Sequence, residues 1–111
     1  MSGRGSSGGG FGGGEGDPEP SSCETLRFDA QLTSPQQAVA AILQLGDVLD
    51  IVVASMKGQT IVQVLKGGQL AGSLTGPDAI QLRTCIEQGH IYRATVLSVN
   101  SGQIRVRVEH V

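Results

Sequence analysis

Apolar and polar residues alternate in several segments after residue 20, which is the pattern of strands with one buried face. In residues 24–32, the apolar residues Leu26, Phe28, Ala30 and Leu32 fall on one face. A dense β-branched run and further alternating runs follow, separated by glycine-containing turns. The pattern predicts six strands, at residues 24–32, 48–54, 60–66, 69–74, 91–99 and 103–110.

Two helices are predicted between these strands, and each begins beside a proline. Ser34 is a favourable N-cap, Pro35 suits the first helical position, and Gln37 completes a capping box. Pro77 opens the second helix in the same way. Glycines are expected to end both helices, and the apolar helical positions are Val39, Ile42, Leu43, Ile80, Leu82, Cys85 and Ile86.

The two halves of this pattern repeat each other at a spacing of 42 to 44 residues. The matching positions are Leu32-Thr33-Ser34-Pro35 with Leu74-Thr75-Gly76-Pro77, Gly46 with Gly89, and Gly58-Gln59 with Gly102-Gln103. Coincidence is the alternative, but the constant order favours a βαββ unit written twice, at about 24–66 and 69–110. We therefore expect a mainly β fold with two short helices, arranged as a six-stranded barrel with an approximate internal two-fold.

Composition divides the 111-residue chain into a tail and one folding unit. Nine of the 17 glycines lie in residues 3–16, where Phe11 is the only bulky apolar residue. Such a segment buries too little surface to offset the entropy of ordering it. We expect residues 1–20 to be a disordered Gly/Ser-rich tail, with or without a role as a tether, and residues 21–111 to form a single domain.

The charge of the expected domain is balanced. The tail holds one of the eight basic residues and three of the ten acidic ones, which leaves seven of each. A domain that contacts phosphates non-specifically is usually clearly basic. The sequence therefore disfavours a general nucleic-acid binder, and it contains no membrane span or phosphate-binding loop.

Cysteine usage bears on the compartment. Cys23 and Cys85 are 62 residues apart and form no metal-binding spacing. We interpret both as structural thiols, Cys85 in the core and Cys23 at the start of the first strand, with their pairing left open. No apolar leader follows Met1. The expected location is the cytoplasm.

The order helix, Gly46-Asp47 and β-branched strand resembles the GD box of cradle-loop barrels, with Gly89-His90 in the second half. That resemblance implies a small duplicated barrel that serves as a binding or structural module. A narrower resemblance is to HIRAN domains, which bind single-stranded DNA ends. It rests on Leu45-Gly46-Asp47-Val48-Leu49, Gln69-Leu70-Ala71-Gly72-Ser73-Leu74 and Tyr92-Arg93-Ala94-Thr95-Val96. The family's Asn/Asp-containing run and its aromatic DNA-contacting positions have no clear counterparts here.

The sequence offers few residues for catalysis. His90 and His110 are expected at the surface, and no third residue completes a metal site with them. Asp47 is expected to brace the turn after Gly46, and Asp50 to be solvated, so neither forms a catalytic pair. We expect no enzyme activity, no metal and no cofactor.

The last two predicted strands carry the candidate binding residues, Tyr92, Arg93, Arg105 and Arg107. If residues 100–102 form a three-residue loop, the two strands pair in the interior as Ala94 with Val108, Val96 with Val106 and Ser98 with Ile104. The outer face would set Arg93 against Glu109, Thr95 near Arg107 and Leu97 near Arg105. Such a surface binds a phosphate, a carboxylate or an acidic peptide, or it only keeps the sheet soluble, with Arg93–Glu109 as a weak ion pair.

Three functions remain in order of preference. The first is a non-enzymatic adaptor module that docks on a larger protein, with self-association left open. The second is an accessory nucleic-acid-binding domain that uses the arginine face. The third is an enzyme, which the sequence supports least.

Overall fold

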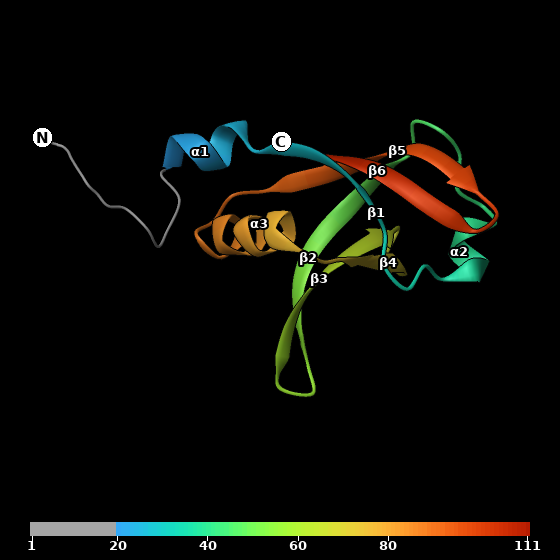
Figure 1. Cartoon of the computed structure of the whole chain (residues 1–111), viewed down its shortest axis with the longest axis horizontal. Coiled ribbons are helices and arrows are strands. Elements are labelled where there is room, and N and C mark those ends of the chain that lie inside the picture. Colours follow the sequence, from blue (N-terminus) through green and yellow to red (C-terminus); the bar gives the residue numbers. More distant parts are fainter. Residues whose placement is uncertain (1–19) are drawn as a thin grey trace, which may run out of the picture.

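The computed structural model describes residues 20–111 (Figure 1). Apart from Pro20, the segment expected to be a disordered tail lies outside these residues. In chain order, the elements are α1 (Pro20–Thr25), β1 (Arg27–Gln31), α2 (Gln37–Ala40), β2 (Val48–Met56), β3 (Gln59–Lys66), β4 (Gln69–Leu74), α3 (Pro77–Glu87), β5 (Tyr92–Asn100) and β6 (Gln103–His110).

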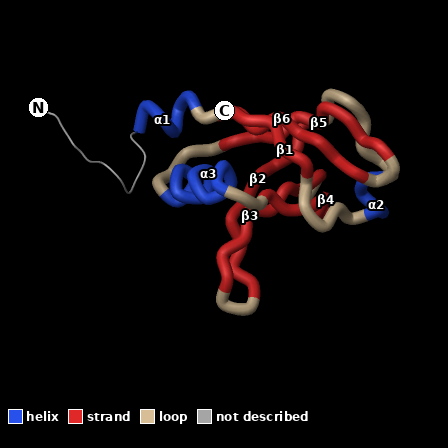
Figure 2. The backbone as a smooth tube through the Cα atoms, viewed as in Figure 1, coloured by secondary structure: helices blue, strands red, loops and turns tan. Residues whose placement is uncertain are grey.

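All six strands belong to one antiparallel sheet with the order β1-β6-β5-β2-β3-β4 (Figure 2). The expected mainly β fold with short helices is confirmed. The two edge strands approach each other through the segment that follows β1, because Thr33 and Ser73 form an isolated antiparallel bridge. Its two backbone hydrogen bonds measure 2.7 and 2.9 Å.

The core lies on one face of the sheet and uses the alternation predicted from the sequence. Ala94, Val96, Val106 and Val108 are buried on the inner face of β5 and β6. Their pairing, Ala94 with Val108 and Val96 with Val106, is as predicted. The other buried apolar side chains come from all parts of the fold, including Leu32, Leu49, Val62, Val64, Leu74, Leu82 and Ile104.

The register of the β5–β6 hairpin changes nearer its turn. The turn contains two residues, Ser101 and Gly102, instead of the predicted three. A bulge between Val96 and Ser98 then places Ser98 opposite Arg105 and Val99 opposite Ile104, so the predicted pair of Ser98 with Ile104 is wrong. A bulge adds one residue to one strand only, and alternation alone does not reveal it.

Cys23 and Cys85 form a disulfide that joins α1 to α3. The expectation of two structural thiols is therefore wrong, and Cys23 lies in a helix and is fully buried. The first strand begins at Arg27 and not at residue 24 as predicted, because α1 extends to Thr25. Disulfides are typical of oxidising compartments. The cytoplasmic location depended partly on free thiols and stays a prediction.

The first predicted helix is reduced to a single turn, α2. Ser34 does not cap it: this residue has a φ of 51°, and Gln36 occupies the N-cap position without a side-chain hydrogen bond to the first turn. The backbone N–H of Gln36 instead donates to the carbonyl of Ala71 at 2.9 Å. Hydrogen bonds to β4 thus replace the capping box, and Ile42 lies beyond the helix at the surface.

The second helix matches its prediction more closely. α3 begins at Pro77, and Gly89 follows its end with a φ of 104°. Leu82 and Cys85 are buried as expected, whereas Ile80 is exposed. No helix within residues 20–111 is long and apolar enough to span a membrane.

Candidate binding surface

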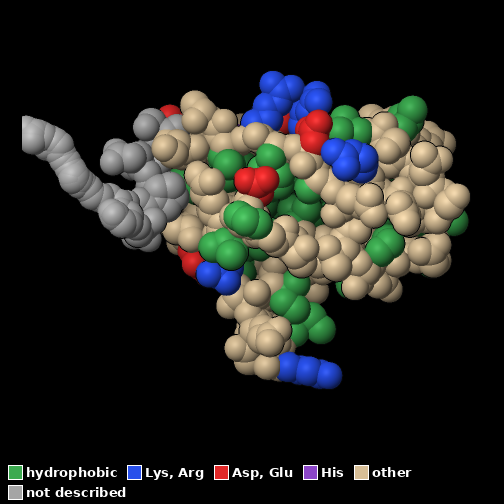
Figure 3. Space-filling view, in the orientation of Figure 1, with side chains coloured by type: hydrophobic (Ala, Val, Ile, Leu, Met, Phe, Trp, Pro, Cys, Tyr) green, Lys and Arg blue, Asp and Glu red, His purple; other side chains and the backbone are tan. Residues whose placement is uncertain are grey.

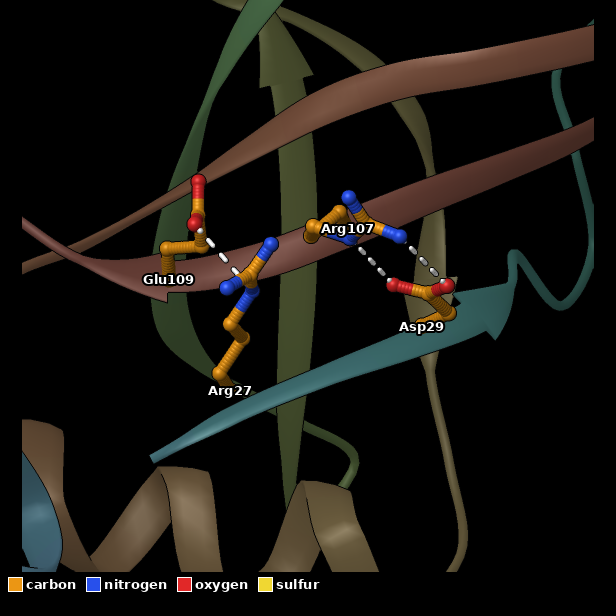
Figure 4. Close-up of polar contacts among 4 residues, drawn as sticks. All are labelled: Arg27, Asp29, Arg107 and Glu109. Carbon is orange, nitrogen blue, oxygen red and sulfur yellow. Dashed lines mark hydrogen bonds and ion pairs between the residues drawn. The ribbon is translucent and has the colours of Figure 1, made fainter. Parts of the chain in front are cut away.

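The outer face of β1 and β6 carries two ion pairs side by side (Figure 4). The strands place Arg27 opposite Glu109 and Asp29 opposite Arg107. The guanidinium of Arg107 donates from Nε and Nη2 to the two carboxylate oxygens of Asp29, at 2.8 and 3.1 Å. Arg27 Nε lies 3.2 Å from Glu109 Oε2. The positive charge expected on this face is therefore partly neutralised within the chain.

The Asp29–Arg107 pair is the tighter of the two, because both partners use a forked geometry. The hydrogen bond from Arg107, together with the positive charges around it, lowers the pKa of Asp29 below its ordinary value of 3.8. The same hydrogen bond raises the pKa of Arg107. Asp29 therefore neutralises part of the charge that Arg107 would offer to a ligand.

The four predicted binding residues do not form one surface. Tyr92 is buried, and its hydroxyl donates a hydrogen bond to the carbonyl of Cys23 in α1. Burial raises the pKa of this hydroxyl. The prediction that Tyr92 belongs to the binding face is wrong, because it shares its strand face with Ala94 and Val96.

Arg93 and Arg105 are exposed and form no ion pair within residues 20–111. Arg93 lies opposite Glu109 as predicted, but Glu109 binds Arg27, so the predicted Arg93–Glu109 ion pair is wrong. Basic and acidic side chains lie together at the edge of the molecule where β6 runs (Figure 3). On this face acidic side chains lie among the arginines, and two of the arginines, Arg27 and Arg107, form ion pairs with them.

The histidines contact each other, which the sequence did not predict. His90 Nδ1 lies 3.0 Å from His110 Nε2. The ring of His110 also meets Tyr92 edge-on, with ring centroids 5.1 Å apart. These residues link the loop after α3 to the end of β6, and no group of metal-binding side chains is found in the described part of the chain.

Asp47 braces the turn before β2, as predicted. Its Oδ2 accepts a hydrogen bond of 2.9 Å from the backbone N–H of Gln44 and lies 3.4 Å from Lys66 Nζ. The hydrogen bond from Gln44 lowers the pKa of Asp47, with a further contribution from Lys66. Asp50 is exposed on β2. Asp47 therefore has a structural role and Asp50 is solvated, and the two carboxylates do not share a site.

A second surface, which we call the aliphatic patch, consists of Ile42, Leu45 and Val48. These side chains are 56%, 70% and 59% exposed. Beside them lies a groove of about 420 Å³, whose walls come from residues 43–45 and from 97–100 of β5. None of the groove residues is ionisable; they are Leu43, Gln44, Leu45, Leu97, Ser98, Val99 and Asn100. Sequence reasoning missed this patch because it assigned Ile42 to a buried helix face.

A pocket of about 400 Å³ lies between β3, β4 and the start of α3. Hydroxyl groups of Thr33, Thr60, Ser73 and Thr75 contribute to its wall, and Arg83 is its one charged lining residue. Thr33 Oγ1 and Thr75 Oγ1 lie 3.0 Å apart and satisfy each other. The pocket combines polar and apolar walls without a pair of groups suited to acid–base chemistry.

Comparison with protein-family models found no match, and comparisons with curated proteins and with solved structures found none either.

Proposed function

We propose that this chain is a non-enzymatic module that docks on a larger protein through the aliphatic patch and its neighbouring groove. The exposure of Ile42, Leu45 and Val48 is the observation that carries the proposal. Exposed apolar side chains that gather on a surface mark protein interaction sites, and Leu45 also lines the groove. Because the groove has no ionisable side chain but includes Gln44, Ser98 and Asn100, its partner surface is expected to be uncharged, with apolar side chains and hydrogen-bonding groups.

We further propose that the sheet closes into a small barrel of two βαββ units, as in the cradle-loop barrels that Gly46-Asp47 resembles. The Thr33–Ser73 bridge supports closure, because it joins the two edges of the sheet. Thr33 and Thr75 occupy matching positions of the two repeats, and they contact each other as residues at a two-fold axis do. Exchanging the halves also preserves the strand pairs: β1–β6 becomes β4–β3, and β2–β5 is unchanged.

The turns of the two repeats support the same proposal. Lys57 and Ser101 lie at matching positions, and their φ angles are 50° and 52°. Non-glycine residues adopt positive φ rarely. The same rare conformation at the same place in each half is expected of a duplicated unit.

Nucleic-acid binding is the weaker alternative. The ion pairs on β1 and β6 leave only Arg93 and Arg105 unpaired on the described part of this face, and Tyr92 is buried where no base can stack on it. Single strands need a basic groove together with exposed aromatic rings. Neither requirement is met in residues 20–111.

The test of docking compares the wild type with Leu45→Asp and with Ile80→Asp as a matched control, since Ile80 is 58% exposed on α3. Each tagged chain is used to capture partners from its host, with and without nuclease, and a captured partner is identified by mass spectrometry. Its affinity is then measured with purified proteins. We expect Leu45→Asp to weaken binding at least about tenfold and Ile80→Asp to leave it unchanged.

Equal binding by wild type and Leu45→Asp would contradict the proposed surface. Loss of the partner on nuclease treatment would favour the nucleic-acid alternative. The second arm measures fluorescence anisotropy with short labelled DNA and RNA strands at several salt concentrations. We expect no binding tighter than roughly millimolar near physiological salt, weaker than ordinary non-specific binding. Tight, salt-sensitive binding that is lost in the Arg93, Arg105 and Arg107 triple alanine variant would overturn the docking proposal.

A further inference from the structure

The pocket between β3, β4 and α3 is separate from the groove beside the aliphatic patch, and the two share no lining residue. One wall is a single face of α3 and its N-cap, formed by residues at helical spacing: Gly76, Ala79, Ile80 and Arg83. A second wall comes from the start of β3 and the end of β4. The volume of about 400 Å³ lies in the range of small-molecule sites, roughly 300–1,000 Å³. The pocket is therefore large enough for a small organic ligand.

The other half of the chain closes the matching space. Gln37 matches Ala79 in the repeat, because each follows the matching proline by two residues. The side chain of Gln37 lies against Gly102 in the β5–β6 turn. Gly58 holds the matching place in the β2–β3 turn, and in the described chain no atom beyond its neighbours comes within 4 Å of a Cβ placed on it. The β2–β3 hairpin instead extends beyond the other strands and helices (Figures 1 and 2). Similar local sequence thus closes this space in one half, and the short Ala79 leaves it open in the other.

Arg83 brings the one charge in the pocket wall. Its side chain is half-buried and forms no ion pair or hydrogen bond within residues 20–111. Glu87 follows Arg83 by one helical turn, the spacing that allows an ion pair, but none forms. Neither Glu87 nor Asp78, the other acidic residue of α3, lines the pocket. The guanidinium therefore has its charge and its N–H donors available to a ligand.

Hydroxyl groups add further donors to the same wall. Those of Thr33 and Thr75 contact each other. Those of Thr60 and Ser73 form no hydrogen bond within the described chain. No carboxylate lines the pocket, so no acidic side chain there competes for these donors. A guanidinium fork binds both oxygens of a carboxylate, and hydroxyl groups can donate to the same oxygens. The free polar groups therefore suit a carboxylate.

The rest of the pocket suits a hydrocarbon group. Val62, Leu74 and Ala79 line it and are buried in the fold, and Ile61 and Ile80 line it from more exposed positions. Contact with aliphatic walls removes apolar ligand surface from water. The single positive charge also limits the ligand, because a carboxylate neutralises it whereas a doubly charged phosphate group would leave an unpaired negative charge.

We propose that this pocket binds a small monocarboxylic acid with an aliphatic group. Arg83 pairs with the carboxylate, and Thr60 and Ser73 donate to its oxygens. The hydrocarbon lies along Val62 and Leu74. This site is independent of docking through the aliphatic patch, because no residue is common to both.

The test follows the backbone amide resonances of the full, isotope-labelled chain by NMR during titration with hexanoate. We expect saturable shifts at Thr60, Ser73 and Arg83, with a dissociation constant of about a millimolar, as is usual for a ligand with so few atoms. Hexanol and hexylamine carry the same hydrocarbon without the negative charge. Each should bind at least about tenfold more weakly, because hydrogen bonds to charged groups are the stronger ones.

Two variants test the residues that make the site. Arg83→Gln removes the charge and should weaken hexanoate binding at least about tenfold. Arg105→Gln is its matched control: it removes an exposed arginine outside the pocket and should leave binding unchanged. Ala79→Gln gives this half the residue that closes the other half, and it should block the pocket. Amide spectra and thermal melting check the fold of each variant.

Arg83→Gln decides the matter if the buried Ala79 tolerates no larger residue, since the Arg83 side chain makes no polar contact that the fold would lose. Equal binding of hexanoate by the wild type and Arg83→Gln would overturn the proposal. Hexanol that binds as tightly as hexanoate would overturn it as well, because the charge would then have no role. So would the absence of saturable shifts, or shifts that centre on Arg93 and Arg105 instead of the pocket.

Discussion

Removing the Cys23–Cys85 disulfide is expected to destabilise the fold more than any surface change. The cross-link closes a loop between cysteines 62 residues apart, which includes most of the sheet. For a loop of this length, the loss of unfolded-chain entropy corresponds to about 4 kcal/mol at 25 °C. Domains of this kind have a total unfolding free energy of about 5–15 kcal/mol. The disulfide is thus expected to supply a large part of the stability.

Two perturbations separate the cross-link from the packing of its sulfur atoms. In the first, the wild type is unfolded, reduced and refolded with a reductant, which keeps the buried side chains nearly unchanged. In the second, Cys23→Ala is combined with Cys85→Ala, which adds a small cavity. Urea unfolding followed by circular dichroism gives the free energy in each case.

We expect reduction to lower the unfolding free energy by about 4 kcal/mol and the double alanine variant to lower it slightly more. Each single alanine variant should match the double variant closely, because either change removes the bond. Equal stability of the oxidised and reduced wild type would refute the reasoning. So would titration of two free thiols in the unfolded, unreduced chain.

Three further predictions concern a core residue, the contact between β4 and the segment after β1, and the pH dependence of stability. Val106→Asp should lower the unfolding free energy by about 4 kcal/mol or more, because its charge enters a buried position; unchanged melting would show that the strand faces are misassigned. Gly72→Ala should lower the unfolding free energy, measured in urea, by about 1–3 kcal/mol, since the new Cβ would lie 2.9 Å from Leu32 Cβ; a neutral effect would mean that β4 and the segment after β1 pack more loosely than described. The ionised Asp29, whose pKa is lowered, stabilises the fold above the ordinary pKa of 3.8, and this contribution is lost as pH falls through the folded-state pKa. Between pH 7 and 2, the melting temperature of Asp29→Asn should therefore fall less steeply than that of the wild type. Identical slopes would contradict a contribution from the contact of Asp29 with Arg107.

The sequence predicted the features that depend on neighbouring residues. β4 has its predicted bounds, and the inner face of β5 and β6 follows the alternation of Ala94 and Val96 with Val106 and Val108. Tyr92 belongs to the same alternation, two residues before Ala94. This alternation predicts a buried Tyr92, so the sequence already argued against placing Tyr92 on the binding face.

Other features depend on contacts between distant segments, and the sequence held no local signal for them. Whether Cys23 meets Cys85 depends on where α1 lies relative to α3. The Asp29–Arg107 ion pair depends on β1 joining the sheet beside β6. Ser34 has good capping chemistry, but hydrogen bonds from its neighbours to β4 outweigh it. At Ser34, a tertiary contact overrides a local preference.

The pairing of β1 with β6 has a consequence for how the chain can be reconnected. Arg27, near the start of the folded part, lies opposite Glu109, near its end, so the two ends adjoin (Figure 1). A short linker can therefore bridge them, and the chain can be opened instead at the Gly67-Gly68 turn between β3 and β4. The resulting circular permutant runs from β4 through β6 and then from β1 through β3, and the sheet accommodates its halves in either order.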